Sequence, residues 1–372
     1  MLKILLLNTP CNGNGDIVFC IKISNYFKEW YNCEITIATT QFEIFKYIIG
    51  KNTKGKEVNL VELKGNNDTN LMCRRFRHLH FSKQIPIQDL IFVTPLNLDM
   101  NINYSDIKAL LNYSNKKNVF FFSEYNDVLN KNFQLPTGIG NNRLGLLLTD
   151  QKIKGKINIL KNKYVVIYVV KSDCHVKTCC NSFIEMVCAK YSKLHEKFDI
   201  VVPQWFNNVY ITEILLNIIS KYFTKVVLHY KIGTETKKDI LYFENENGVH
   251  TKNVLNIRSD ILPLKHNDIL KLYKNSEEDI LLTGDQSITD ILSCCYTKNI
   301  FYQIVPWKKD FAIYLSKLMP NKYMKSVKTS CGSLGAIKYK KHDYKKFISK
   351  WDFRVLGKKV LDDIVYNFLE NN

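Results

Sequence analysis

The chain contains no apolar run long enough to cross a membrane and no continuous basic block, and we expect no secretory leader. A membrane-spanning helix needs about 20 apolar residues, and no apolar stretch of these 372 residues reaches that length. The apolar start, MLKILLLNTP, is too short for a leader peptide and runs into a glycine-rich loop. We therefore interpret it as a first β-strand and expect a cytoplasmic protein.

A metal-binding cysteine pattern is also missing, although the chain has 11 cysteines. Cys179–Cys180 and Cys294–Cys295 are adjacent pairs, not C-x-x-C pairs. Cys174-His175 is the best metal candidate, but a second pair of ligands at a suitable spacing is absent. We expect reduced, mostly buried thiols, and neither a metal nor another cofactor.

The formal net charge is +18, which favours anionic partners such as nucleotides or acidic lipid surfaces. The lysines are dispersed among asparagines and isoleucines. The one cluster that combines basic and aromatic residues is CRRFRHLHF (73–81), which a solvated loop or helix face also explains. Nucleic acid is therefore not the expected partner, although a non-enzymatic nucleotide- or RNA-binding protein stays open as an alternative.

Apolar stretches alternate with amphipathic ones along the whole chain. This alternation is typical of parallel sheets covered by helices on both faces. In the first half, we expect strands at 3–9, 34–40, 89–96, 118–125 and 144–150, and helices at 15–31 and 41–49. In the second half, we expect strands at 164–172, 199–205, 225–230, 254–257, 279–283 and 299–305, with helices around 178–194, 210–222 and 266–276.

A chain of this length exceeds what one hydrophobic core usually serves, so two domains are expected. The Lys- and Gly-rich stretch 149–163 is the predicted junction. We predict a Rossmann-like domain at 1–155, a second one at 164–343, and C-terminal helices at 344–372 that pack back on the first domain. The predicted fold class is α/β, with two doubly wound domains facing each other across a cleft.

The first motif is NTPCNGNGDIVF (8–19), in which Asn12, Gly13 and Gly15 form a loop between strand and helix. The third glycine of the dinucleotide fingerprint is absent, because Phe19 stands there, so a classical NAD site is excluded. Asp16 opens the predicted helix. It can be a simple N-cap, or a carboxylate at the cleft edge that takes a proton from a nucleophile.

The second motif is TGDQS (283–287), between an apolar strand and a helix. Gly284 gives the turn backbone freedom, and Asp285 or Ser287 can cap the helix. Alternatively, the N–H groups near Gln286 and Ser287 can bind a phosphate, because a helix N-terminus carries partial positive charge. The surrounding order of elements favours the phosphate.

Two further segments follow strand ends in the second half. Leu262 and Pro263 suit a backbone wall against a flat base, or they merely fill a surface loop. Tyr302 and Gln303 can bind a donor sugar by stacking and hydrogen bonding, or they belong to an aromatic core.

The order strand, proline loop, short helix, strand, TGDQS turn, helix and strand resembles the donor-binding half of GT-B glycosyltransferases. The opening NGNGDIVFCIKISNYFKEW is similar to those of heptosyltransferase-like enzymes and protein-arginine rhamnosyltransferases. The resemblance implies that Asp16 is the base and that the turn from Gly284 to Ser287 binds the donor diphosphate. Gln286 stands where the rhamnosyltransferases have an acidic residue.

The resemblance implies a metal-independent, inverting glycosyltransferase that uses a nucleotide-diphosphate sugar and an unknown acceptor: a protein, a glycan or a lipid-linked molecule. The absence of an Asp-x-Asp metal signature agrees with this scheme. A sugar-nucleotide epimerase of the same fold is the alternative enzyme. An epimerase is expected to carry several acidic residues in its cleft, whereas only Asp16, Glu124 and Asp285 fall at predicted strand ends.

Overall fold

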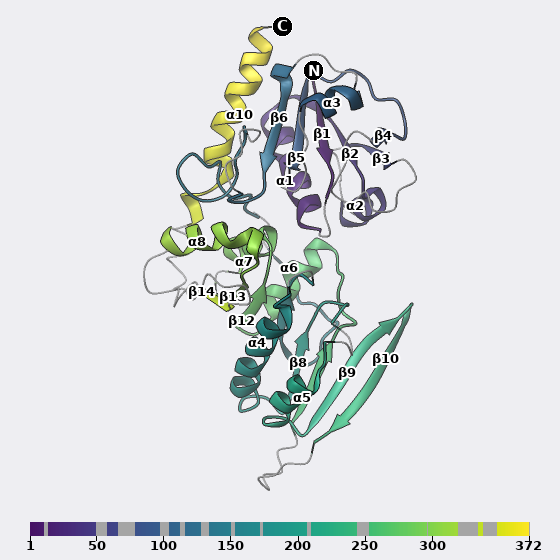
Figure 1. Ribbon diagram of the computed structural model, residues 1–372, viewed down its shortest axis with the longest axis vertical. Helices are drawn as coiled ribbons and strands as arrows, with labels where there is room; N and C mark the ends of the chain where they lie inside the picture. The colour runs from purple at the N-terminus through teal and green to yellow at the C-terminus, as the bar shows by residue number, and fades with distance from the viewer. Residues whose placement is uncertain are drawn as a thin grey trace. The chain divides into compact units, whose positions relative to one another are not determined.

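The computed structural model divides into two compact units (Figure 1). The first unit comprises Met1–Leu148 and Ile348–Asn372, and the second comprises Thr149–Phe347. The structure describes residues 1–10, 14–49, 58–65, 79–96, 104–111, 116–127, 134–149, 153–171, 174–206, 210–243, 253–295, 297–318, 334–337 and 348–371.

The first unit has a six-stranded sheet in the order β4-β3-β2-β1-β5-β6. All neighbouring strands are parallel except β3 and β4. The strands are β1 (Leu2–Asn8), β2 (Cys33–Thr39), β3 (Asn59–Gly65), β4 (Leu79–Phe81), β5 (Leu90–Leu96) and β6 (Val119–Ser123), and the helices are α1 (Gly15–Trp30), α2 (Phe42–Ile49), α3 (Tyr104–Leu111) and the 3₁₀ turn η3 (Lys116–Asn118). The strand order reverses between β1 and β5, which is the topological switch point of a doubly wound sheet.

The predicted strand at 144–150 is wrong. Leu146 forms only an isolated bridge, to Asp352 at the start of the last helix α10 (Phe353–Glu370). The Leu146 N–H donates to the Trp351 carbonyl at 2.6 Å, and the Phe353 N–H donates to the Leu146 carbonyl at 3.0 Å. The neighbouring Gly145 has φ +89°, and an added Cβ would lie 2.6 Å from the Trp351 oxygen, so this close approach needs glycine.

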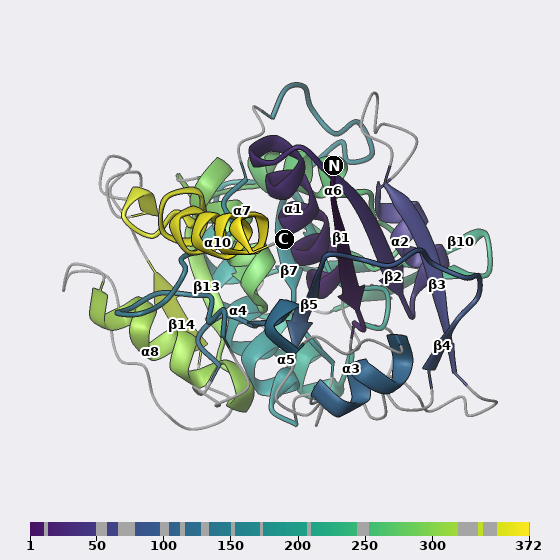
Figure 2. The same cartoon turned by 90° about the horizontal axis from the view of Figure 1, so that it is seen from above.

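Helix α10 packs beside α1, as Figure 2 shows. The rings of Tyr26 and Phe353 stack with centroids 5.6 Å apart, and the Tyr31 hydroxyl donates to Asp362 at 2.8 Å. The C-terminal segment therefore returns to the first unit, as the predicted fold class requires.

The second unit has an eight-stranded sheet in the order β10-β9-β11-β8-β7-β12-β13-β14, with antiparallel strands only at its two edges. The strands are β7 (Lys163–Tyr168), β8 (Lys197–Val201), β9 (Lys225–Ile232), β10 (Glu235–Tyr242), β11 (Val254–Arg258), β12 (Asp279–Leu282), β13 (Asn299–Gln303) and β14 (Leu334–Ile337). The helices are α4 (Val176–Tyr191), α5 (Glu213–Ser220), α6 (His266–Asn275), α7 (Asp285–Cys294), the 3₁₀ turn η4 (Pro306–Lys308) and α8 (Lys309–Leu318).

Strand β10 was not predicted. It forms a long hairpin with β9 and returns the chain to the amino edge of the sheet (Figure 1), which a crossover helix usually does in a parallel sheet. Its sequence, ETKKDILY, is mostly exposed, so the apolar signal of a buried strand is weak. Both units nevertheless have the doubly wound architecture, which confirms the predicted α/β class with two such domains.

Candidate functional site

The 283–287 turn lies at the topological switch point of the second sheet. Strands β7 and β12 are neighbours, but the connections from them run to opposite halves of the sheet. Thr283 and Gly284 follow β12 directly, and α7 begins at Asp285. Ligands of open α/β sheets bind outside the carboxyl ends of the strands at such a point.

The N-cap position of α7 makes no side-chain cap hydrogen bond in the described part of the chain. Its N-cap residue is Gly284, with φ 92° and ψ 147° and no side-chain cap hydrogen bond. Asp285 and Ser287, the two capping candidates, are both residues of the helix itself. An added Cβ at Gly284 would find nothing within 4 Å. The helix thus begins beside open space, and its first N–H groups have no side-chain cap.

Asp285, in the first turn of α7, forms an ion pair with Lys308 of η4. The Lys308 Nζ lies 2.9 Å from the Asp285 Oδ2, and both side chains are largely buried. A carboxylate at a helix N-terminus repels an incoming anion, so neutralisation by Lys308 makes this position compatible with a phosphate.

Gln286 and Ser287 are each 8 % exposed. The Gln286 amide donates to the Asp290 carboxylate at 2.8 Å, one turn further along α7. Ser287 lies beside the buried phenol of Tyr273; burial raises the pKa of that phenol well above 10, and the interaction with Ser287 opposes the shift.

Tyr302 and Gln303, the predicted donor contacts that follow the turn in sequence, are both buried. Tyr302 is 1 % exposed and packs edge-on against Phe311, so its ring belongs to the core. Gln303 is fully buried, and its Oε1 accepts hydrogen bonds from the Thr283 hydroxyl and from the Val170 N–H. Gln303 therefore ties together the carboxyl ends of β7, β12 and β13.

The loop after β11 contains the cis peptide bond Leu262–Pro263, with Leu262 buried and Pro263 exposed. Upstream, Arg258 binds the Asp260 carboxylate through Nε at 2.8 Å and through a second nitrogen at 2.9 Å. Burial alone would raise the pKa of Asp260, but the guanidinium outweighs it and the pKa is lowered. Arg258 and Asp260 together hold the start of this loop.

In the first unit, Asp16 lies in the first turn of α1, beyond the carboxyl end of β1 and next to the switch point. Asn8 was not among the predicted site residues; its amide donates to the Thr94 carbonyl at 2.7 Å and to the Asp16 carbonyl at 3.1 Å. Its Oδ1 accepts from the Thr39 hydroxyl at 3.1 Å. Asn8 thus fixes the start of α1 relative to three strand ends.

Of the predicted glycine loop, Gly15 is exposed at the start of α1, with nothing within 4 Å of an added Cβ. Asn12 and Gly13 lie outside the described residues, as does most of the basic cluster 73–81.

His266 and Asp290 form a hydrogen-bonded pair that was not predicted from the sequence either. The His266 Nε2 lies 2.9 Å from the Asp290 Oδ2, across the space between α6 and α7. The residues are 24 positions apart on different helices, so no local pattern joins them.

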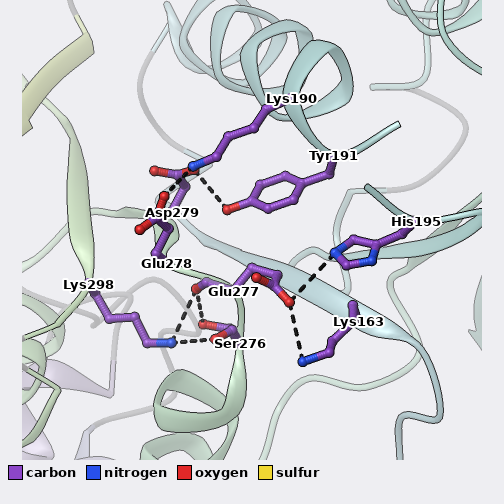
Figure 3. A network of polar contacts seen from close by, with 9 residues as sticks. All are labelled: Lys163, Lys190, Tyr191, His195, Ser276, Glu277, Glu278, Asp279 and Lys298. Atoms are coloured by element: carbon purple, nitrogen blue, oxygen red, sulfur yellow. Dashed lines mark hydrogen bonds and ion pairs between the residues drawn. The ribbon is translucent and has the colours of Figure 1, made fainter. Parts of the chain in front are cut away.

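A second polar network lies at the opposite, amino edge of the same sheet (Figure 3). Asp279, 2 % exposed, accepts from Lys190 at 2.6 Å, from Tyr191 at 2.8 Å and from Asn299 at 2.8 Å. The buried Lys298 ammonium donates to the carbonyls of the segment before β12, and burial lowers its pKa. The other members are Lys163, His195, Ser276, Glu277 and Glu278.

Within the part of the chain that the structure describes, no group of three or more His, Cys, Asp or Glu residues could hold a metal ion. Of the sequence candidates, Cys179 and Cys180 are buried and Cys174 is exposed. Among the described helices, none is long and apolar enough to span a membrane.

No protein-family model matches the chain, and no curated protein matches it. The chain is similar to the solved structure of S. aureus MnaA with UDP, at 9 % identity and a TM-score of 0.48, over 99 % of this chain and 97 % of that one. It is also similar to E. coli heptosyltransferase WaaC with ADP, at 9 % identity and a TM-score of 0.35, over 78 % and 83 % of the two chains. A third is the N-terminal domain of Candida albicans trehalose-6-phosphate phosphatase, at 11 % identity and a TM-score of 0.44, over 98 % and 97 %. Because these TM-scores lie below 0.5, the fold class rests on the strand order and connections of the chain itself.

Proposed function

We propose that the protein is an inverting, metal-independent glycosyltransferase that uses a nucleotide-diphosphate sugar as donor. The observation that carries the proposal is the start of α7: an uncapped helix N-terminus, at a switch point, with open space beside Gly284. A diphosphate is the ligand that such a helix start favours. The resemblance of the 254–303 segment to GT-B donor domains supports the same ligand.

In the proposed reaction, an acceptor nucleophile attacks the anomeric carbon from the face opposite the diphosphate. The bond from that carbon to the phosphate oxygen breaks, and its electron pair leaves with the nucleoside diphosphate. The first N–H groups of α7, its dipole and the Ser287 hydroxyl stabilise the charge on the leaving group. Asp16 takes the proton of the nucleophile. The acceptor can be a protein, a glycan or a lipid-linked molecule.

The first test is a thermal-shift screen of the unaltered protein with UDP, ADP, GDP, CDP and dTDP. A ligand at 100 times its Kd adds about 2.7 kcal/mol to the free energy of unfolding. At least one of these ligands is expected to raise the melting temperature. Failure of the whole panel would contradict the proposal.

The second test addresses Asp16. With the ligand family identified, Asp16→Asn is expected to retain the donor affinity and to lose about 10²–10⁴ in turnover, measured as nucleoside diphosphate release from the sugar donor. Glu43, another acidic residue in the first turn of a helix, provides the control variant Glu43→Gln, which should keep full turnover. Unchanged turnover in Asp16→Asn would show that Asp16 is not the general base.

A further inference from the structure

The His266–Asp290 pair is built differently from a surface ion pair. Asp290 is 2 % exposed. Its Oδ1 accepts from the Thr149 hydroxyl at 2.6 Å and from the Gln286 amide at 2.8 Å, while its Oδ2 faces the His266 ring at 2.9 Å. Three donors around one buried carboxylate fix its orientation, so the direction of the bond to His266 is fixed as well.

This bond determines which ring nitrogen of His266 carries the proton. An ionised carboxylate only accepts hydrogen bonds, so Nε2 must donate to Asp290. In the neutral ring, Nδ1 is then the nitrogen with the lone pair. Within the described residues, Nδ1 has no hydrogen-bond partner and is not among the buried unpaired atoms, and the side chain is 20 % exposed. A ligand can therefore reach an acceptor whose tautomer the protein has set.

Three further titratable groups interact with Asp290: the half-buried phenol of Tyr168, the buried phenol of Tyr273 and the buried thiol of Cys295. Burial raises the pKa of Tyr168, of Tyr273 and of the Cys295 thiol, and the Asp290 charge raises each further. His266 differs from these groups in that it hydrogen-bonds the Asp290 carboxylate directly and keeps contact with solvent.

The position of the pair relative to α7 indicates which part of a nucleotide meets it. Asp290 lies one turn beyond Gln286 and Ser287, and His266 opens α6 directly after the Leu262–Pro263 loop. A ligand with its phosphates at the first turn of α7 and its base along that loop would have its sugar portion near His266.

We propose that His266 Nδ1 accepts a hydrogen bond from a hydroxyl group in the sugar portion of the bound nucleotide, with Asp290 as the positioning residue. The inference rests on the proposed function. His266 is then a binding residue for the sugar, whereas the start of α7 binds the phosphates. The affinity for a ligand without a sugar should therefore not change when His266 is replaced.

The test compares a nucleoside diphosphate with inorganic pyrophosphate, by calorimetric titration of the same variants. His266→Gln keeps an amide that can donate to Asp290 and removes the Nδ1 acceptor. The affinity for the nucleoside diphosphate is expected to fall about threefold to tenfold, as for the loss of one neutral hydrogen bond. The affinity for pyrophosphate should change by less than about twofold.

His195→Gln is the matched control. His195 also lies near a carboxylate, with its Nε2 3.7 Å from Glu277 and 22 % exposure, but at the amino edge of the sheet (Figure 3). It is expected to change neither affinity. Melting curves of both variants establish that each is folded.

A second readout does not depend on nucleotide affinity. Carbethoxylation by diethyl pyrocarbonate, located by peptide mass spectrometry, should modify His266 at Nδ1 and should be slowed by the nucleoside diphosphate that binds.

Equal nucleoside diphosphate affinity in His266→Gln and in the unaltered protein, with binding still sensitive to Ser287→Ala, would overturn this inference and leave the proposed function standing. A His266 that resists carbethoxylation would also overturn it, because Nδ1 would not be accessible. If the unaltered protein binds neither pyrophosphate nor any nucleoside diphosphate, the proposed function fails and the inference fails with it.

Discussion

The second unit carries a polar network at each edge of its sheet, and the two differ in what their polar atoms face. At the amino edge, Asp279 has three partners on two elements, α4 and β13, and Lys298 donates to two backbone carbonyls (Figure 3). At the carboxyl edge, Asp290 is equally enclosed, but its partner His266 keeps one nitrogen without a protein partner in the described chain, and α7 begins without a side-chain cap. The protein itself satisfies Asp279 and Lys298 in the first network, whereas the second keeps a solvent-accessible His266 nitrogen and a helix start that a ligand can use.

This comparison separates two kinds of damage. Changes at the amino edge should lower the free energy of unfolding and leave ligand affinity alone, since Asp279 and Lys298 bind groups of the protein itself. Changes at the carboxyl edge should lower ligand affinity with smaller effects on stability.

The largest effect on binding is expected from Gly284→Val. The φ of 92° costs a side chain about 1–3 kcal/mol of stability, and the new side chain would fill the space beside the first N–H groups of α7. Nucleoside diphosphate binding should fall below detection in calorimetry.

Gly233→Val is the matched control for backbone strain. Gly233, in the β9–β10 turn, has φ +61° and also finds nothing within 4 Å of an added Cβ. It should show a similar loss of stability with unchanged affinity. If both glycine variants bound the nucleotide equally well, the start of α7 would not be the binding site.

The next effect tests the amino edge. Asp279→Asn removes the charge that Lys190, Tyr191 and Asn299 bind, and the free energy of unfolding in urea is expected to fall by about 2–3 kcal/mol, the range for hydrogen bonds to a charged group. Nucleotide affinity should stay within twofold. A loss of affinity as large as the loss of stability would contradict the separation of the two edges.

A smaller effect is expected from Lys308→Met, which leaves the Asp285 carboxylate without its neutralising charge beside the incoming phosphates. Nucleoside diphosphate affinity should fall about fivefold to twentyfold, roughly 1–2 kcal/mol. The double variant Asp285→Asn/Lys308→Met should recover most of that affinity. Unchanged affinity in the single variant would show that this ion pair does not adjoin the phosphates.

The smallest effect is a pH dependence at the Arg258–Asp260 pair. Because the pKa of Asp260 is lowered below 3.8 in the folded chain, its ionised form stabilises the fold above that pH, and this contribution is lost as the pH falls through the lowered pKa. Asp260→Asn should therefore reduce the melting temperature near neutral pH and flatten its decline in acid. If the melting temperature of the variant fell equally steeply in acid, other carboxylates would cause the loss of stability.

Local patterns predicted the elements that frame the candidate site. The apolar run 3–9 and the amphipathic stretch 15–31 correspond closely to β1 and α1, and DILLT followed by a polar turn corresponds to β12 and α7. These signals lie within one segment, so the sequence contains them directly.

The features that were missed depend on distant partners. Leu146, in the segment wrongly predicted as a strand, exchanges backbone hydrogen bonds with Trp351 and Phe353, about 200 positions away. Asp290 acquires its role from His266 on another helix. Asn8 appears in the sequence as the last residue of a strand, and only the fold brings the ends of β2 and β5 to it. The core position of Tyr302 likewise depends on its contact with Phe311 of α8, which the sequence of β13 does not indicate.

The most direct test of the central claim is calorimetric titration of Ser287→Ala with the nucleoside diphosphate that stabilises the unaltered protein most. Ser287 does not cap α7, so the melting temperature should change little. Affinity should fall by about 1.5–3 kcal/mol, the range for a hydrogen bond to a charged group. Unchanged affinity together with a stability loss of about 1 kcal/mol, the value of a lost helix cap, would show instead that the 283–287 turn only caps the helix.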